Sequence, residues 1–123
     1  MTQVKEWSNQ ELNRKLAELM GYSVRKSANC YQIIKGPSYG QWQADESYAW
    51  ADAPDYCNDP AASLEVQTAA CKVDGERYIW ELAIIQGWVG GKIISRKEGV
   101  RIATATPRER AEAAYITMQG ERT

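Results

Sequence analysis

Apolar residues near the N-terminus recur at the spacing of a helix. Leu12, Leu16 and Leu19 follow one another at steps of four and three residues, which places them on one helical face. The segment Ser8-Asn9-Gln10-Glu11 just before them is a capping box, in which a serine hydroxyl accepts from the amide three residues further on. The pattern therefore predicts a helix over Asn9–Met20.

Two more helices are predicted by the residues that would begin them. Asp59-Pro60 offers an N-cap followed by a proline at the first helical position, where its missing N–H costs nothing. Thr106-Pro107-Arg108-Glu109 is a second capping box, and Gly120 would end the helix that it begins. The residues expected to point inward are Ala62, Val66, Ala69 and Val73 in the first of these helices, and Ala111, Ala114, Tyr115 and Met118 in the second.

One strand is expected in the first half of the chain. Tyr31–Ile34 has the aromatic and β-branched residues typical of strands, and the segment Gly36–Gly40 breaks it. From Gln41 to Asn58 neither periodicity is sustained, although the segment is rich in aromatic residues. Disordered segments are poor in aromatics, so an ordered loop or irregular edge strand is expected there.

Three strands are expected in the second half. After the turn signal Asp74-Gly75, the segment Arg77–Ile85 alternates so that Tyr78, Trp80, Leu82 and Ile84 would share one face of a long strand. Shorter strands are predicted at Ile93-Ile94 and at Val100–Thr104, with bends before and between them. The resulting order is α-β-α-β-β-β-α, which predicts an α+β fold: an antiparallel sheet with helices packed on it.

Composition sets broad limits on the protein. A chain of 123 residues that is 44% hydrophobic and 25% charged has the size and make-up of one globular domain, so we expect residues 1–123 to form a single α+β domain. No apolar run reaches the length of a membrane span, and the first residues are polar rather than signal-like. The expected location is therefore the cytoplasm, without membrane contact.

The residue types available for chemistry are restricted. Histidine is absent, which removes the commonest general base and the commonest metal ligand. Cys30, Cys57 and Cys71 lie too far apart for a paired zinc motif, and their odd number argues against a disulfide framework. The acidic residues of segment 45–59 have no calcium-loop spacing, and several stand where turns and caps favour aspartate. We therefore expect no enzyme activity, no cofactor and no metal site.

Three segments resemble the phage ABA sandwich family, whose members are small phage and prophage proteins. They are Leu19–Tyr22 at the end of the first helix, Tyr56–Val66 at the start of the second, and Ala103–Ala114 at the start of the third. The resemblance spans most of the chain. It implies a three-layer α/β/α sandwich and a phage origin, with the host cytoplasm as the location, but no general activity to transfer.

The start of the last predicted helix is a candidate anion site. Arg108 and Arg110 stand beside the free N–H groups after Thr106, where positive charge is unfavourable unless an anion binds. The alternative is that Glu109 and solvent screen two ordinary surface arginines. Arg101 is a candidate neighbour of this site, and Trp88 and Trp42 are candidate rings for stacking on a base.

These features favour a non-enzymatic phage-type binding protein for a small phosphorylated ligand. A counter-defence sponge that sequesters a cyclic or ADP-ribose-derived nucleotide signal is the first hypothesis. The formal charge of −1 argues against general nucleic-acid binding. The surplus of Trp and Tyr also suggests a homo-oligomer. The alternative hypothesis is a protein–protein inhibitor or accessory module that docks through its aromatic-acidic segment 39–58.

Overall fold

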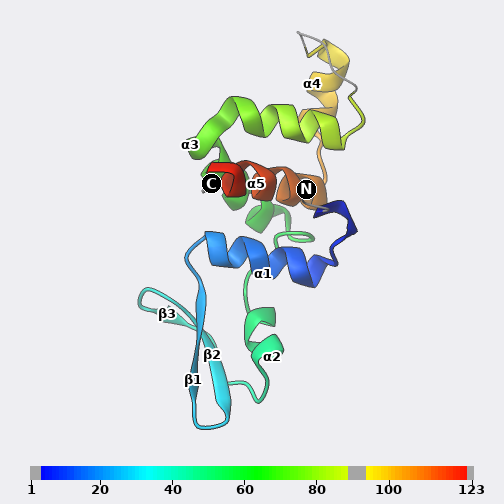
Figure 1. The fold of residues 1–123 in the computed structure, drawn as a ribbon. Coiled ribbons are helices and arrows are strands. Elements are labelled where there is room, and N and C mark those ends of the chain that lie inside the picture. Colours follow the sequence, from blue (N-terminus) through cyan, green and yellow to red (C-terminus); the bar gives the residue numbers. More distant parts are fainter. Residues whose placement is uncertain (1–3, 89–93, 122–123) are drawn as a thin grey trace.

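The computed structural model describes residues 4–88 and 94–121, and within them the fold is α+β, as predicted (Figure 1). A short 3-10 turn, η1 (Val4–Glu6), comes before the first helix. The helices are α1 (Asn9–Leu19), α2 (Glu46–Ala51), α3 (Pro60–Ile85), α4 (Arg96–Ala103) and α5 (Pro107–Glu121). The strands β1 (Ser23–Ser27), β2 (Cys30–Lys35) and β3 (Ser38–Tyr39) form one antiparallel sheet.

The hydrophobic core lies where α5 passes between α1 and α3 (Figure 1). Small side chains on α5 let its neighbours approach closely, and Ala111 and Ala114 are fully buried there. The inward faces of the flanking helices supply Leu12, Leu16, Val66, Tyr78 and Leu82. Within the described residues, no helix combines the length and the apolar character needed to cross a membrane.

The capping signals are confirmed. The Ser8 hydroxyl accepts from the Glu11 amide at 3.1 Å, and the Asp59 carboxylate accepts from the Ala61 amide at 3.0 Å. The box at Thr106 is reciprocal, because the Glu109 amide donates to the threonine hydroxyl at 3.1 Å and the Thr106 amide donates to the Glu109 carboxylate at 2.9 Å. Local sequence therefore determines where α1, α3 and α5 begin.

The sheet has one face against α2 and the opposite face towards solvent. In the β1–β2 register Val24 pairs with Ile33, and both pack on the core. The next pair towards the hairpin end, Arg25 with Gln32, points to the other face, because alternate residues of a strand face opposite sides. Gln43 bridges to Tyr31 beyond β3 and extends the sheet by one pairing.

The long strand predicted over Arg77–Ile85 is wrong, because these residues form the second half of α3. Tyr78 and Leu82 are buried at helical spacing, whereas Trp80 and Ile84 are exposed apolar residues on another side. Those two exposed residues created the apparent alternation. The predicted turn at Asp74 is a kink: this residue alone leaves the helical conformation, with φ −163° and ψ 90°, and its carboxylate then caps the Arg77 amide at 3.1 Å.

The strand predicted over Val100–Thr104 is also wrong, because α4 occupies most of it. The box Ser95-Arg96-Lys97-Glu98 begins that helix, with the Ser95 hydroxyl accepting from the Glu98 amide at 3.3 Å. Of the predicted strand Ile93-Ile94, the first residue lies outside the described residues and the second has no regular structure.

Two smaller expectations also change. The segment 41–58, expected to be a loop or edge strand, contains the short helix α2. On α3 the buried stripe passes through Ala70 rather than Val73, which is exposed. The order of elements is therefore α-β-β-β-α-α-α-α. The strand predicted at Tyr31–Ile34 is confirmed within β2, but its two partners come from residues 23–39 and not from the second half of the chain. Among the described contacts, α2 is the helix that packs against this sheet, while α1 and α3 each pack on α5.

Candidate functional site

Arg108, the first arginine of the predicted anion site, is bonded within the protein. Its Nε donates to the Glu112 carboxylate at 2.6 Å, and its terminal nitrogens donate to acceptors on the N-terminal segment and on Cys57. The remaining acceptors are the Asn9 side chain at 2.8 Å, the Val4 carbonyl at 3.0 Å and the Trp7 carbonyl at 2.8 Å. These bonds hold the segment before α1 against α5 and leave Arg108 no spare donor for a ligand.

The other predicted ligand residues lie in separate places. Thr106 is engaged in its capping box, and Arg110 donates to the Ser63 hydroxyl at 3.1 Å. Arg101 is exposed on α4, and its guanidinium lies 4.0 Å from the Glu98 carboxylate. The Trp88 ring packs edge-on against the Trp80 ring, with 4.5 Å between the ring centroids. Trp42 follows β3 on the sheet, packed with Arg25. The structure does not bring these residues together into one pocket.

The sheet combines cations with aromatic rings on both of its faces, and these residues are here called the basic–aromatic surface. By strand alternation Arg25 lies on one face, and Lys26 and Lys35 lie on the other. Residues 19–44 contain three basic residues and no acidic residue. Each of the three cations lies over a ring, at 4.9 to 5.7 Å from its centroid. The surface consists of the pairs Arg25 with Trp42, Lys26 with Tyr31 and Lys35 with Tyr22, together with the exposed ring of Tyr39.

Arg25 is held in a fixed orientation on the open face of the sheet. Its Nε donates to the buried Gln32 side chain at 2.7 Å, and Gln32 in turn donates to the Gly40 carbonyl at 2.8 Å. The guanidinium lies 5.2 Å from the centre of the Trp42 ring. Among the described residues, its two terminal nitrogens make no hydrogen bond and no carboxylate pairs with it. A planar arginine fork that is anchored at one end and open at the other suits a phosphate oxygen pair.

Two aromatic rings stand on the same face as Arg25. Tyr39 pairs with Ile34 across the sheet, two residues along β2 from Gln32, and cross-strand partners share a face. Tyr39 is 71% exposed and Trp42 is 44% exposed. Because two residues of a strand span about 7 Å, these rings offer two separate places for a planar group.

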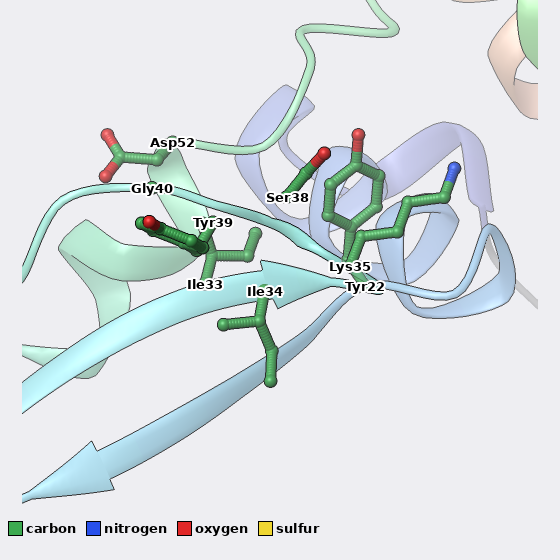
Figure 2. Close-up of a pocket in the computed structure, with 8 residues that line it drawn as sticks. All are labelled: Tyr22, Ile33, Ile34, Lys35, Ser38, Tyr39, Gly40 and Asp52. Atoms are coloured by element: carbon green, nitrogen blue, oxygen red, sulfur yellow. The ribbon is translucent and has the colours of Figure 1, made fainter.

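A shallow cavity of about 170 Å³ lies at the turn end of this surface (Figure 2). The Lys35 ammonium stands beside the Tyr22 ring, 4.9 Å from its centroid. Ile33 and Ile34 point to opposite sides of β2, so the cavity wraps around the edge of the sheet near β3. The Asp52 carboxylate stands at the far wall, where it accepts a hydrogen bond from the side-chain amide of Gln43 at 2.9 Å.

Gly40 holds the edge strand close to β2. A Cβ atom at this position would meet the Ile33 side chain at 2.8 Å, which is closer than real side chains tolerate. The Gly40 amide donates to the Ile33 carbonyl at 2.9 Å, and its carbonyl accepts from Gln32. Gly40 therefore ties the segment that carries Tyr39 and Trp42 to Gln32, the residue that orients Arg25.

The sequence identified Trp42 as a candidate ring but not Arg25 and Tyr39, which share its face of the sheet, nor Lys35 on the other face. The available signal was the absence of acidic residues over 19–44 beside several rings. The formal charge of the whole chain hid it, because acidic residues elsewhere cancel the local excess. The pairing of Arg25 with Trp42 depends on strand register, which a single sequence does not give.

The Cys57 thiol is not poised for nucleophilic chemistry. Burial raises the pKa of the Cys57 thiol to about 11, although the nearby Arg108 guanidinium acts to lower it. Cys57 is therefore protonated at neutral pH, and a thiol is a much weaker nucleophile than a thiolate. Within residues 4–88 and 94–121, no three Cys, Asp or Glu side chains gather in a way that would hold a metal ion.

Comparisons with known proteins found no matching family model, no matching curated protein and no matching solved structure. The resemblance to the phage ABA sandwich family stays a prediction.

Proposed function

We propose that this chain is a non-enzymatic binding protein for a phosphorylated nucleotide ligand, held on the basic–aromatic surface of the sheet. The observation that carries the proposal is the geometry of Arg25, which is anchored by Gln32, stacked on Trp42 and open at its terminal nitrogens. A phosphate would take those nitrogens, and a base would take a neighbouring ring. Here the nucleotide site is on the sheet rather than at the start of α5.

The surface has the energetics that such a ligand requires. Stacking of a base on an aromatic ring contributes about 1–3 kcal/mol, and the exposed rings of Tyr39 and Trp42 provide two faces. A hydrogen bond to a charged group contributes about 1.5–3 kcal/mol, and Arg25 has unused donors. Neither contribution needs a deep pocket, which fits the shallow form of the site.

The biological role proposed with this binding is sequestration of a host nucleotide signal in counter-defence. It rests on two expectations from the sequence. One is the resemblance to phage proteins, and the other is that a chain without histidine binds a ligand without converting it. A homo-oligomer belongs to the same proposal, because exposed Trp and Tyr rings are typical of protein–protein interfaces.

A thermal-shift screen tests the proposal. The ligands are cyclic dinucleotides, cyclic trinucleotides and cyclic ADP-ribose isomers, with the corresponding nucleosides as phosphate-free controls. We expect at least one phosphorylated ligand to raise the unfolding temperature, by an amount that grows with the logarithm of its concentration relative to Kd, and the nucleosides to do so far less. Absence of any shift across the nucleotides contradicts the proposal.

A matched pair of tryptophan variants localises the binding. Trp42 and Trp80 are each 44% exposed, but Trp80 lies on α3, away from the sheet. Trp42→Leu should weaken nucleotide binding by about 5-fold to 100-fold, the loss of one stacking interaction. Trp80→Leu should leave the affinity unchanged, and an equal loss in both variants would contradict a site on the sheet.

The alternative function, docking on a partner protein through segment 39–58, is supported by Tyr48. This ring is 58% exposed on α2, next to Asp45 and Glu46. The structure buries Trp50 and Tyr56 in the core, so those two rings are not free for a partner. Tyr48→Ala should leave nucleotide binding intact under the proposed function and abolish partner capture under the alternative.

A further inference from the structure

A second cavity, of about 200 Å³, lies between α3, α4 and α5, away from the sheet. Apolar side chains form much of its wall, among them Leu64, Ile79 and Ile102. Gln67 and Tyr78 add polar atoms, and the one charged residue among the lining residues is Arg110. The cavity therefore places a single positive charge in largely apolar surroundings.

Arg110 is only partly satisfied by the protein. One terminal nitrogen donates to the Ser63 hydroxyl at 3.1 Å, and Ser63 in turn donates to the Pro60 carbonyl at 2.8 Å. Among the described residues, no carboxylate pairs with Arg110. Arg108, two residues earlier on the same helix, has both an ion pair and a full set of acceptors. A half-buried arginine without a counter-charge is unfavourable unless an anion compensates it.

The neighbouring polar atoms suit an anion as well. The buried Tyr78 hydroxyl donates to the side-chain oxygen of Gln67 at 2.8 Å. Because that bond uses the oxygen of the side-chain amide, its nitrogen remains available as a donor. That nitrogen makes no hydrogen bond among the described residues. Arg110 and Gln67 together present N–H donors, with no acidic group in the cavity wall to compete for them.

We propose that this cavity binds a small organic anion, with its carboxylate or phosphate on Arg110 and Gln67 and a short apolar body against Leu64, Ile79 and Ile102. Pockets for drug-sized ligands measure roughly 300–1,000 Å³, so this smaller cavity suits a short anion better than a larger ligand. The site is independent of the nucleotide surface on the sheet, and neither requires the other.

Calorimetric titration tests the site with butyrate and butyl phosphate, and with butan-1-ol and butylammonium as controls. We expect one or both anions to bind and the two controls not to bind. The relative affinities of the carboxylate and the phosphate then identify the preferred head group. Equal heat with butan-1-ol, or no binding by either anion at millimolar concentrations, overturns the proposal.

Two variants localise this binding, and a third serves as the control. Arg110→Gln should reduce anion affinity by about 10-fold or more, since a charge-assisted hydrogen bond is lost. Ile102→Trp keeps the arginine but fills the cavity, so it should also prevent binding. Arg101→Gln removes an exposed arginine that is already near Glu98, and it should bind like the parent. Unchanged binding in the first two variants contradicts the site, and circular dichroism confirms that each variant is folded.

The two proposed sites can be tested independently of each other. Nucleotide binding on the sheet should be the same in the parent and in Arg110→Gln, and butyrate binding should be the same in the parent and in Trp42→Leu.

Discussion

At the scale of single residues, two arginines on one turn of α5 have opposite roles. Arg108 bonds to the N-terminal segment, to Cys57 and to Glu112, whereas Arg110 faces a cavity with one hydroxyl partner. The sequence placed both at the start of a helix and gave no reason to separate them. Their difference arises from which elements pack over each one.

Replacement of Arg108 should destabilise the fold. Arg108→Ala leaves the Glu112 carboxylate and two backbone carbonyls without their donor, and we expect a loss of about 2–4 kcal/mol in the free energy of unfolding. Arg96→Ala, on the exposed side of α4, should change it by less than about 0.5 kcal/mol. Urea denaturation measures both, and a similar small effect for the two variants would contradict the structural role of Arg108.

The three cysteines should differ in reactivity. Cys30 and Cys71 are exposed, whereas Cys57 is buried with a pKa raised to about 11. At pH 8 a thiol reagent such as Ellman's reagent should modify the first two in the native protein and reach Cys57 only after unfolding. Mass spectrometry of the labelled peptides gives the answer, and rapid native labelling of Cys57 would count against its burial.

Cys57 should also make the fold less stable in alkali. Its thiol ionises near the ordinary value of 9.0 in the unfolded chain but near 11 in the folded protein, so the folded state holds its proton longer. The stabilising contribution is complete below pH 9 and is lost as the pH rises towards 11. Cys57→Ala should reduce the fall in unfolding free energy across this range, although Tyr56 and Tyr78, whose pKa values burial also raises, keep part of it. An unchanged slope would contradict the assignment.

At the scale of elements, the sequence predicted helix starts better than element type. Ser8, Asp59 and Thr106 begin helices as expected, because a cap needs only the residues next to it. The second half of α3 was mistaken for a strand, because Trp80 and Ile84 are apolar without being buried. The local signals for helices here are the capping box at Ser95, which begins α4, and the capping carboxylate of Asp74, at which α3 restarts.

The restart of α3 at Asp74 allows the contribution of a helix cap to be measured. Asp74 and Asp45 both stand at the start of a helical segment, but only the Asp74 carboxylate accepts a backbone hydrogen bond there. Asp74→Ala should therefore cost about 1 kcal/mol of stability, and Asp45→Ala should cost much less. Thermal or urea unfolding distinguishes them, and equal effects would show that the Asp74 bond does not support the helix.

At the scale of the whole molecule, the formal charge of −1 conceals separate regions of opposite charge. The sheet carries three cations and no acid over residues 19–44, and the acidic residues begin again at Asp45. Charge counted over the full chain argued against binding of nucleic acid in general, and it gave no indication of this local surface. Only the fold shows that Arg25 shares its face of the sheet with the exposed rings of Tyr39 and Trp42.

The central claim is that Arg25 binds the phosphate of a nucleotide on the sheet, and one calorimetric comparison tests it most directly. Arg14 is the matched control, since it also lies over a tryptophan, Trp50, at 4.9 Å, but it is already paired with Glu46 at 3.6 Å. With the nucleotide that gives the largest thermal shift, Arg25→Gln should weaken binding by about 10-fold to 100-fold, while Arg14→Gln retains the parent affinity. Parent-like affinity in Arg25→Gln would contradict the claim.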